Sequence, residues 1–266
     1  MKTMMKYAIH PTAIIGDNVQ IGNEVTIGPY ALIHDNVHIG NGATIGPQCI
    51  LGEPLADFYG NPQYENPPLI IGENAVIRSG TIIYAGSQVG VSFETGHRVT
   101  IREGTTIGDH VRIGTLSDIQ GYCELGNYVR LHSNVHIGQK SKIGDFVWIF
   151  PYTVLTNDPH PPSNQLVGVT IEDFAVIATM VVIMPGVQVG QDALIGAMAS
   201  VRTDVAPGAV VVGSPAKQVT TVDQIKNRFT GEPVYPWREH FGRGMPWEEL
   251  GYENWSLALQ ERKEVR

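Results

Sequence analysis

The sequence predicts an all-β fold, a left-handed parallel β-helix with the shape of a triangular prism. Isoleucine, leucine or valine returns every six residues, usually with glycine after it and a small or β-branched residue in the fifth place. The pattern is plain in IGDNVQ, IGNEVT, IGPYAL, IHDNVH, IGNGAT and IGPQCI, which follow one another from residue 15 to residue 50. Repeats of one length over so long a stretch indicate a solenoid.

A six-residue period does not match the 3.6-residue period of an α-helix. It matches a coil in which each hexad supplies one short strand and one corner. Three hexads then make a coil of about 18 residues, and successive coils stack about 4.8 Å apart through parallel strand pairing. The first and fifth residues of each hexad should fill the interior, and glycine or asparagine should support the tight corners.

Two loops and a tail divide the chain. The repeat breaks at 57–69 and at 159–169, and long loops on a rigid scaffold often carry function. After Lys217 the hexads stop, and the remaining residues hold three of the four tryptophans. We therefore expect a β-helix domain at 1–217 and a C-terminal cap at 218–266, packed on its own subunit or on a neighbour.

The composition excludes several classes of protein. A net charge of −8 gives no basic surface for nucleic acid or for an anionic membrane. The absence of about 18 consecutive apolar residues argues against a spanning helix, and the N-terminus lacks the pattern of a signal peptide, so we expect a cytoplasmic protein. Cys49 and Cys123 occupy the same place in hexads several coils apart, which predicts reduced core thiols.

The hexads, together with VVGSPAK at 211–217, resemble the hexapeptide-repeat acyltransferases over roughly residues 9–217. This resemblance implies a homotrimer with active sites between adjacent prisms, an acyl-CoA such as acetyl-CoA as co-substrate, and no metal. VVGSPAK is similar to the stretch of this family that lies near the nucleotide end of the coenzyme. Ser214 and Lys217 are therefore expected to contact its phosphates.

Further segments are similar to N-acyltransferases of nucleotide-linked sugars within that family. These segments are IHPTAIIG, NPPLIIGENAVIRSGTIIYAG, FETGHRVTIRE, VLTND and YPWREHFGRGMPW. The resemblance implies acylation of the 3- or 4-amino group of a dTDP-linked dideoxy sugar, a reaction of surface polysaccharide biosynthesis. The partners implied are a nucleotide-linked amino sugar and an acyl-CoA.

One column of outward residues contains Glu103, Gly121, Gln139 and Asn157. In the related O-acyltransferases the catalytic histidine falls at the position of Gln139, and some amino-sugar relatives have an acid there, paired with an asparagine one coil later. Glutamine is no base, so Gln139 and Asn157 are expected to bind a sugar hydroxyl or the oxyanion. Two polar side chains on a solvated face are the alternative.

A second column places Asp118 beneath His136. A carboxylate bound to one imidazole nitrogen fixes the tautomer and makes the other nitrogen more basic, so this pair is the best candidate for a general base. Two alternatives stay open. In one the contact is without consequence, and in the other the departing thiolate accepts the proton.

Substrate contacts are expected around Thr95, where an aliphatic position of the repeat is lost and a local distortion is predicted. His97 should stack on Ser79 and, with Glu94, reach the sugar or its amine. Arg78 or Arg102 should neutralise a diphosphate.

Three other functions remain as alternatives. A UDP-sugar O-acyltransferase shares the first coils but ends in a compact helical domain. A γ-type carbonic anhydrase would bind Zn²⁺ through three histidines, and His97, His132 and His136 miss its spacing by one residue in each interval. The third alternative is a β-helix that acts only as a scaffold.

Overall fold

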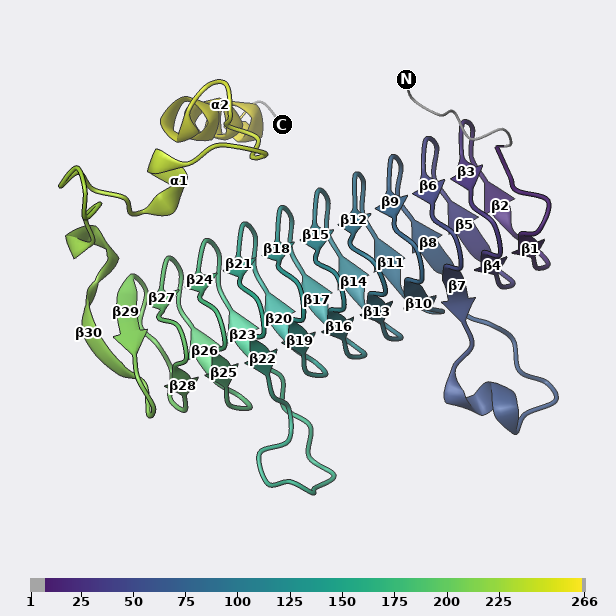
Figure 1. Cartoon of the computed structure of the whole chain (residues 1–266), viewed down its shortest axis with the longest axis horizontal. Coiled ribbons are helices and arrows are strands. Elements are labelled where there is room, and N and C mark those ends of the chain that lie inside the picture. Colours follow the sequence, from purple (N-terminus) through teal and green to yellow (C-terminus); the bar gives the residue numbers. More distant parts are fainter. Residues whose placement is uncertain (1–7, 265–266) are drawn as a thin grey trace.

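The computed structural model describes residues 8–264 and shows a triangular prism built from three parallel sheets (Figure 1). Residues 1–7 of the predicted β-helix domain and residues 265–266 of the predicted cap lie outside this range. As far as β28, consecutive strands pass from one sheet to the next, and every third strand returns to the same sheet. We call the outer sides of these sheets the first, second and third faces, in the order in which the chain reaches them.

The faces contain ten, nine and eleven strands. The first face consists of β1 (Ile14–Ile15), β4 (Leu32–Ile33), β7 (Ile50–Glu53), β10 (Ile82–Tyr84), β13 (Thr100–Ile101), β16 (Asp118–Ile119), β19 (His136–Ile137), β22 (Val154–Leu155), β25 (Val182–Ile183) and β28 (Ser200–Val201). The second face consists of β2 (Gln20–Ile21), β5 (Val37–Ile39), β8 (Leu69–Ile71), β11 (Gln88–Val89), β14 (Thr106–Ile107), β17 (Glu124–Leu125), β20 (Lys142–Ile143), β23 (Thr170–Ile171) and β26 (Gln188–Val189). The third face consists of β3 (Thr26–Ile27), β6 (Thr44–Ile45), β9 (Val76–Ile77), β12 (Glu94–Thr95), β15 (Arg112–Ile113), β18 (Arg130–Leu131), β21 (Trp148–Ile149), β24 (Val176–Ile177), β27 (Leu194–Ile195), β29 (Ala209–Val212) and β30 (Lys217–Thr221).

The interior follows the predicted pattern of first and fifth residues. Ile137 and Leu155 are fully buried, as is Thr81 at a fifth position. Thr95 also points inward and stays in register with Ile113, so the predicted distortion at this position is wrong. Its hydroxyl accepts a hydrogen bond from the Arg78 backbone N–H at 2.9 Å, which satisfies a polar group that would otherwise cost stability.

The two cysteines are buried and unpaired, as predicted. Burial raises the pKa of Cys123 to about 11, so its thiol stays protonated and unreactive at neutral pH. Within residues 8–264 no helix is long and apolar enough to cross a membrane.

The corners differ from the sequence prediction. The fourth residue of a hexad has a positive φ whether or not it is glycine or asparagine, as in Leu116 (φ 60°) and Tyr128 (φ 56°). Its backbone N–H is bound to the previous coil, for example Leu116 N–H to the His97 carbonyl at 3.0 Å, and such bonds hold the strained conformation in place. Glycine in the second place, as at Gly72, lies close to the next coil, but Arg102, Gln120 and His132 show that larger residues also occupy this place.

Both long loops leave the prism at the edge between the first and second faces (Figure 1). The first loop joins β7 to β8 and contains a short 3-10 helix, η1 (Ala56–Tyr59). Leu69 is buried in β8, so the sheet resumes two residues earlier than the repeat pattern indicated. The second loop joins β22 to β23 and is ordered by Asp158, which accepts hydrogen bonds from the Ser163 hydroxyl and backbone.

The C-terminal segment closes the last coil and then turns back along the prism (Figure 1). Strand β30 pairs antiparallel with β29, so sheet hydrogen bonding continues past the predicted boundary at Lys217. The elements that follow are η2 (Val222–Gln224), α1 (Trp237–His240) and α2 (Tyr252–Glu264). Trp237 and Trp247 pack on Phe146 and Phe174 at the edge between the second and third faces, so the segment covers a side of the prism as well as its end. The division into two domains stays a prediction.

Replacing Gly72 by alanine should lower the free energy of unfolding by about 1–3 kcal/mol, the usual cost of overpacking. A Cβ at this position would lie 2.4 Å from the backbone of Gly90 in the next coil. Gly60, in the first loop, is the matched control, since no atom lies within 4 Å of a Cβ there. Thermal denaturation of both variants checks the prediction. An equal effect of the two substitutions would contradict it.

Candidate active site

Asp118 and His136 form a bonded pair on the first face. Strands β16 and β19 place them side by side, and the Nδ1 atom of His136 lies 3.1 Å from the Oδ2 atom of Asp118. The two side chains are 41% and 39% exposed, so a substrate can reach them. With Nδ1 held by the carboxylate, Nε2 is the ring nitrogen that can take a proton. The stacking is as predicted, and its catalytic role stays a prediction.

Asp118 is held in its charged form. Partial burial acts to raise its pKa, but hydrogen bonds from His136 and Gln120 outweigh burial and leave the pKa below its ordinary value. The Gln120 amide donates to the same Oδ2 atom at 2.7 Å. An ionised Asp118 stabilises the imidazolium that forms when His136 accepts a proton. Sequence reasoning missed Gln120, although it lies two residues after Asp118.

Gln139 and Asn157 lie beside this pair, at the edge between the first and second faces. A Cβ on Gly138 would be 3.1 Å from the Asn157 Cβ, so the two coils are in close contact there. The second loop folds back on this point, because the Val167 N–H donates to the Asn157 carbonyl at 2.8 Å. Both residues are partly exposed, and among residues 8–264 neither side-chain amide has a hydrogen-bond partner. Both amides are therefore free to bind a ligand.

The turn with Ser214 lies at the far end of the first face, whereas Lys217 begins β30, which belongs to the sheet of the third face. The turn with Ser214 is joined to β28 by two hydrogen bonds, from Ser200 N–H to the Gly213 carbonyl at 3.0 Å and from Ala216 N–H to the Ser200 carbonyl at 2.9 Å. Ser214 and Lys217 are exposed. Between this turn and His136 the outward residues are Val154 and Val182, so the first face offers a mainly apolar track three strand spacings long, about 14 Å.

The other predicted substrate residues are spread over two edges. Ser79 and His97 stack as expected at the edge between the third and first faces, where Ser79 Oγ lies 2.8 Å from His97 Nδ1. Glu94 does not join His97 but points outward from the third face, where it pairs with Arg112 at 3.1 Å and with Arg78 at 3.7 Å.

Arg102 lies at the opposite edge of the first face. Its Nε atom is bound to Glu103 at 2.7 Å, and its guanidinium lies 5.0 Å from the centre of the Tyr84 ring. Arg78 and Arg102 therefore belong to different edges. Arg102 is held more tightly by its carboxylate partner, at 2.7 Å, than Arg78 is by Glu94, at 3.7 Å, so Arg102 is the weaker candidate of the two for a diphosphate contact.

The three histidines of the carbonic anhydrase alternative do not meet. His97 is bound to Ser79 and His136 to Asp118, whereas the His132 ring stacks on Phe150 at 4.5 Å. Burial lowers the pKa of His132. In the described part of the chain, no group of three His, Cys, Asp or Glu side chains is arranged to hold a metal ion. Within one subunit these three histidines therefore have separate partners, whereas this alternative places its zinc site at a subunit interface.

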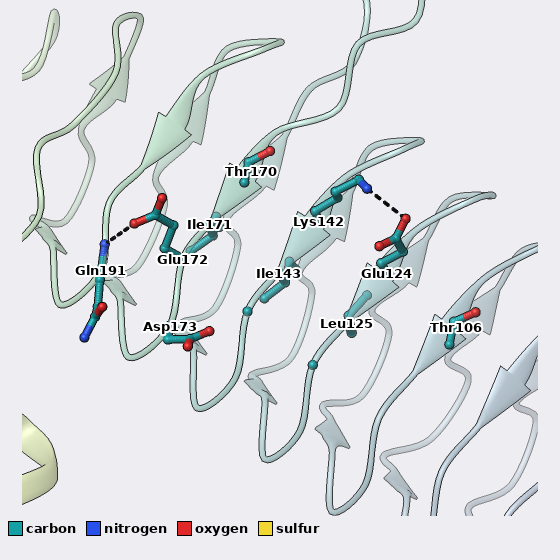
Figure 2. A pocket seen from close by; sticks show the side chains of 12 residues that line it. Thr106, Glu124, Leu125, Lys142, Ile143, Thr170, Ile171, Glu172, Asp173 and Gln191 are labelled. Carbon is teal, nitrogen blue, oxygen red and sulfur yellow. Dashed lines mark hydrogen bonds and ion pairs between the residues drawn. The ribbon is translucent and has the colours of Figure 1, made fainter.

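A hollow of about 720 Å³ on the second face is not part of this site (Figure 2). Its charged groups are already bound, Lys142 to Glu124 at 3.0 Å and Glu172 to the Gln191 backbone at 2.9 Å. It lies on a different face from His136, and its lining residues include no histidine bonded to a carboxylate. We interpret it as the shallow outer surface of stacked coils.

Two family models match parts of the chain. One is described as bacterial transferase hexapeptide (six repeats) and matches residues 104–139. The other is described as hexapeptide repeat of succinyl-transferase and matches residues 12–47. The two matches lie in separate parts of the prism, and both models describe a six-residue repeat.

Similar proteins are acyltransferases. A chloramphenicol acetyltransferase from Morganella morganii is 29% identical over 177 residues, which cover 65% of this chain and 73% of the relative. A 2,3,4,5-tetrahydropyridine-2,6-dicarboxylate N-acetyltransferase from Staphylococcus aureus is 36% identical over 94 residues, or 35% of this chain and 34% of the relative. Among solved structures, the Arabidopsis UDP-N-acetylglucosamine acyltransferase shares the fold, with a TM-score of 0.59, 23% identity, and coverage of 80% and 72%.

The repeat, the prism and these relatives together fit a hexapeptide-repeat β-helix acyltransferase, the class that the resemblance implied. It is an enzyme that transfers an acyl group from a donor to an acceptor.

His136→Asn should lower kcat by about 10²–10⁴-fold, the usual contribution of a general base, and leave acceptor binding nearly unchanged. Asp118→Asn should cause a smaller loss of kcat, because Asp118 only orients and polarises the ring. Because the pKa of Asp118 is lowered, its carboxylate stays charged as the pH falls through the range where histidine is protonated. The acidic fall in kcat should therefore depend on His136.

Steady-state kinetics against pH test this pair. Leu32→Ala, a change of an outward residue of the same face four strands from Asp118, is the control for general effects on the first face. A His136→Asn enzyme within about threefold of wild type would exclude the pair as the base and favour the thiolate as proton acceptor.

Proposed function

We propose that this enzyme transfers an acetyl group from acetyl-CoA to the amino group of a nucleotide-linked 3- or 4-amino-dideoxy sugar, with dTDP as the nucleotide. We infer that it acts as a homotrimer, since the first face of one prism supplies only one wall of a substrate groove. The single observation that carries the proposal is the continuous arrangement on this face, from the turn at Ser214 to the pair of His136 and Asp118.

The donor, acetyl-CoA, fits the first face with its phosphates near Ser214 and its thioester near His136. The exposed Lys217 and the turn at Ser214 suit the phosphates of CoA, and the apolar side chains of Val182 and Val154 suit an extended pantetheine arm. A thioester at the end of that arm would then lie close to His136. An acyl carrier protein is the other donor used for such transfers, and it would need a protein-docking surface in addition to this track.

The acceptor is inferred from the residue types at the neighbouring edge. Gln139 stands where the resemblance places a histidine in O-acyltransferases, and an amide cannot activate a hydroxyl group. An amine with a free lone pair needs much less activation, so the pair Gln139 and Asn157 suits N-acylation. The name of the relative that acylates nitrogen, the tetrahydropyridine dicarboxylate N-acetyltransferase, supports the same choice.

The proposed reaction brings together the amine of the sugar, the thioester of the donor and the side chains at this site. The amine attacks the thioester carbonyl carbon, a C–N bond forms, and negative charge collects on the carbonyl oxygen. The side-chain N–H groups of Gln139 or Asn157 can donate to that oxyanion. When the C–S bond breaks, CoA leaves as a thiolate, and the proton lost by nitrogen goes to Nε2 of His136 or to the thiolate.

A screen of dTDP- and UDP-linked sugars with acetyl-CoA should release free thiol only with amino sugars. The matched control is the same nucleotide sugar with a hydroxyl group in place of the amine. Turnover of the hydroxyl sugar would support the O-acyltransferase instead. The scaffold alternative predicts no thermal shift with acetyl-CoA, whereas a bound ligand at 100 times its Kd stabilises by about 2.7 kcal/mol.

Gln139→Ala and Asn157→Ala should each lower kcat/KM for the sugar by about tenfold or more, the effect of a lost hydrogen bond to a charged oxygen. KM for acetyl-CoA should change little. Thr106→Ala on the second face is the control, because that residue lies away from the track. A variant that loses only affinity for acetyl-CoA would show that this edge binds the donor.

A further inference from the structure

A pocket rich in arginine lies on the third face, between the prism and the C-terminal segment. It has a volume of about 490 Å³ and extends to the edge that leads to the first face. Phe241, Arg243 and Gly244 of the C-terminal segment form one wall. Its charged lining residues are Arg78, Arg112, Arg130, Arg243 and Glu94. Four guanidinium groups against one carboxylate make this pocket strongly positive in a chain whose net charge is −8.

Arg130 is the most informative of these residues. It is only 7% exposed, and in the described part of the chain no carboxylate lies within 4 Å of it. Its guanidinium donates to the backbone carbonyls of His110, Val129 and Gly244, the last at 2.8 Å. Burial and the neighbouring charge of Arg112 lower its pKa to about 10. A buried charge without a counter-ion is costly, and a bound anion would supply that counter-ion.

The pocket also offers an unused donor and aromatic surface. Trp148 lines it, and the Trp148 indole N–H is buried without a hydrogen-bond partner among residues 8–264. Trp148 and Phe241 also line an adjoining hollow of about 190 Å³, together with Tyr235 and Trp237. Aromatic side chains of this kind stack on planar bases. Charge, an unpaired donor and stacking surface thus meet in one place.

We propose that this pocket binds a nucleoside diphosphate, with Arg112, Arg130 and Arg243 on the diphosphate and Trp148 or Phe241 against the base. Guanidinium groups bind phosphate oxygens in paired hydrogen bonds, which suits a diphosphate better than a single carboxylate. Ser133 lines the pocket and precedes His136 by three residues around the edge. A group attached to the diphosphate can therefore extend toward the first face.

Two substrates of the proposed reaction contain this chemistry, the nucleotide-linked sugar and CoA, so the choice between them rests on the proposed function. In the proposed function the phosphates of the coenzyme lie at the turn with Ser214, at the end of the prism. The arginine pocket is therefore assigned to the nucleotide of the acceptor.

Titration calorimetry with dTDP and, separately, with CoA tests this site without any need for turnover. Arg112→Gln and Arg243→Gln should each weaken dTDP binding by about tenfold or more. Both side chains are exposed, so the variants should fold, which thermal denaturation checks. Arg228→Gln is the matched control, an exposed arginine whose guanidinium lies against Phe229 instead. With a turned-over acceptor, KM should rise by the same factor while kcat stays within about threefold.

The outcomes separate this site from the proposed function. Weaker binding of dTDP in both variants supports the pocket, even if no amino sugar is acylated in the screen. Weaker binding of CoA in both variants also supports a diphosphate in the pocket but assigns it to the donor. Unchanged affinity for both ligands, or no binding of either by the wild type, would overturn the proposal.

Discussion

Each coil of the prism is hydrogen-bonded to the coils before and after it, and this parallel register controls everything else in the structure. Asp118 lies beside His136, and His136 beside Val154, because the strands that hold them pair without a shift. The two long loops add residues between strands, yet Val37 still pairs with Leu69 and Lys142 with Thr170. Insertions are thus accommodated outside the prism, and the outward columns continue past them, with a local register shift where Tyr84 pairs with Glu53 beside the first loop.

The register also explains where strain and close contact occur. The positive φ at the fourth residue of a hexad is tolerated even in Leu116 and Tyr128, because the hydrogen bonds of the neighbouring coil fix the backbone. Where the second residue is glycine, as at Gly72, an added Cβ would lie 2.4 Å from the next coil, whereas elsewhere this place holds larger residues such as Gln120. A rigid scaffold of this kind keeps Asp118 and His136 at a fixed separation without help from a ligand.

The C-terminal segment adds what a regular solenoid cannot provide. Outward residues of a β-helix line nearly flat faces, on which a small ligand would stay exposed to water. Trp237 and Trp247 anchor the segment on Phe146 and Phe174, and the segment then forms a second wall above Arg112 and Arg130. Arg130 joins the two parts directly through its hydrogen bond to Gly244.

The sequence by itself determined the fold, the interior, and the stacking of His136 on Asp118 and of His97 on Ser79, because a constant coil length turns spacing into contact. The same rule would have found Arg112 and Arg130, which occupy successive strands of one face. It would also have paired Glu94 with Arg112, which lies one coil further on. Only the tertiary structure decided that Arg243 meets the prism. That contact depends on the path of a tail without repeats, which a six-residue period does not contain.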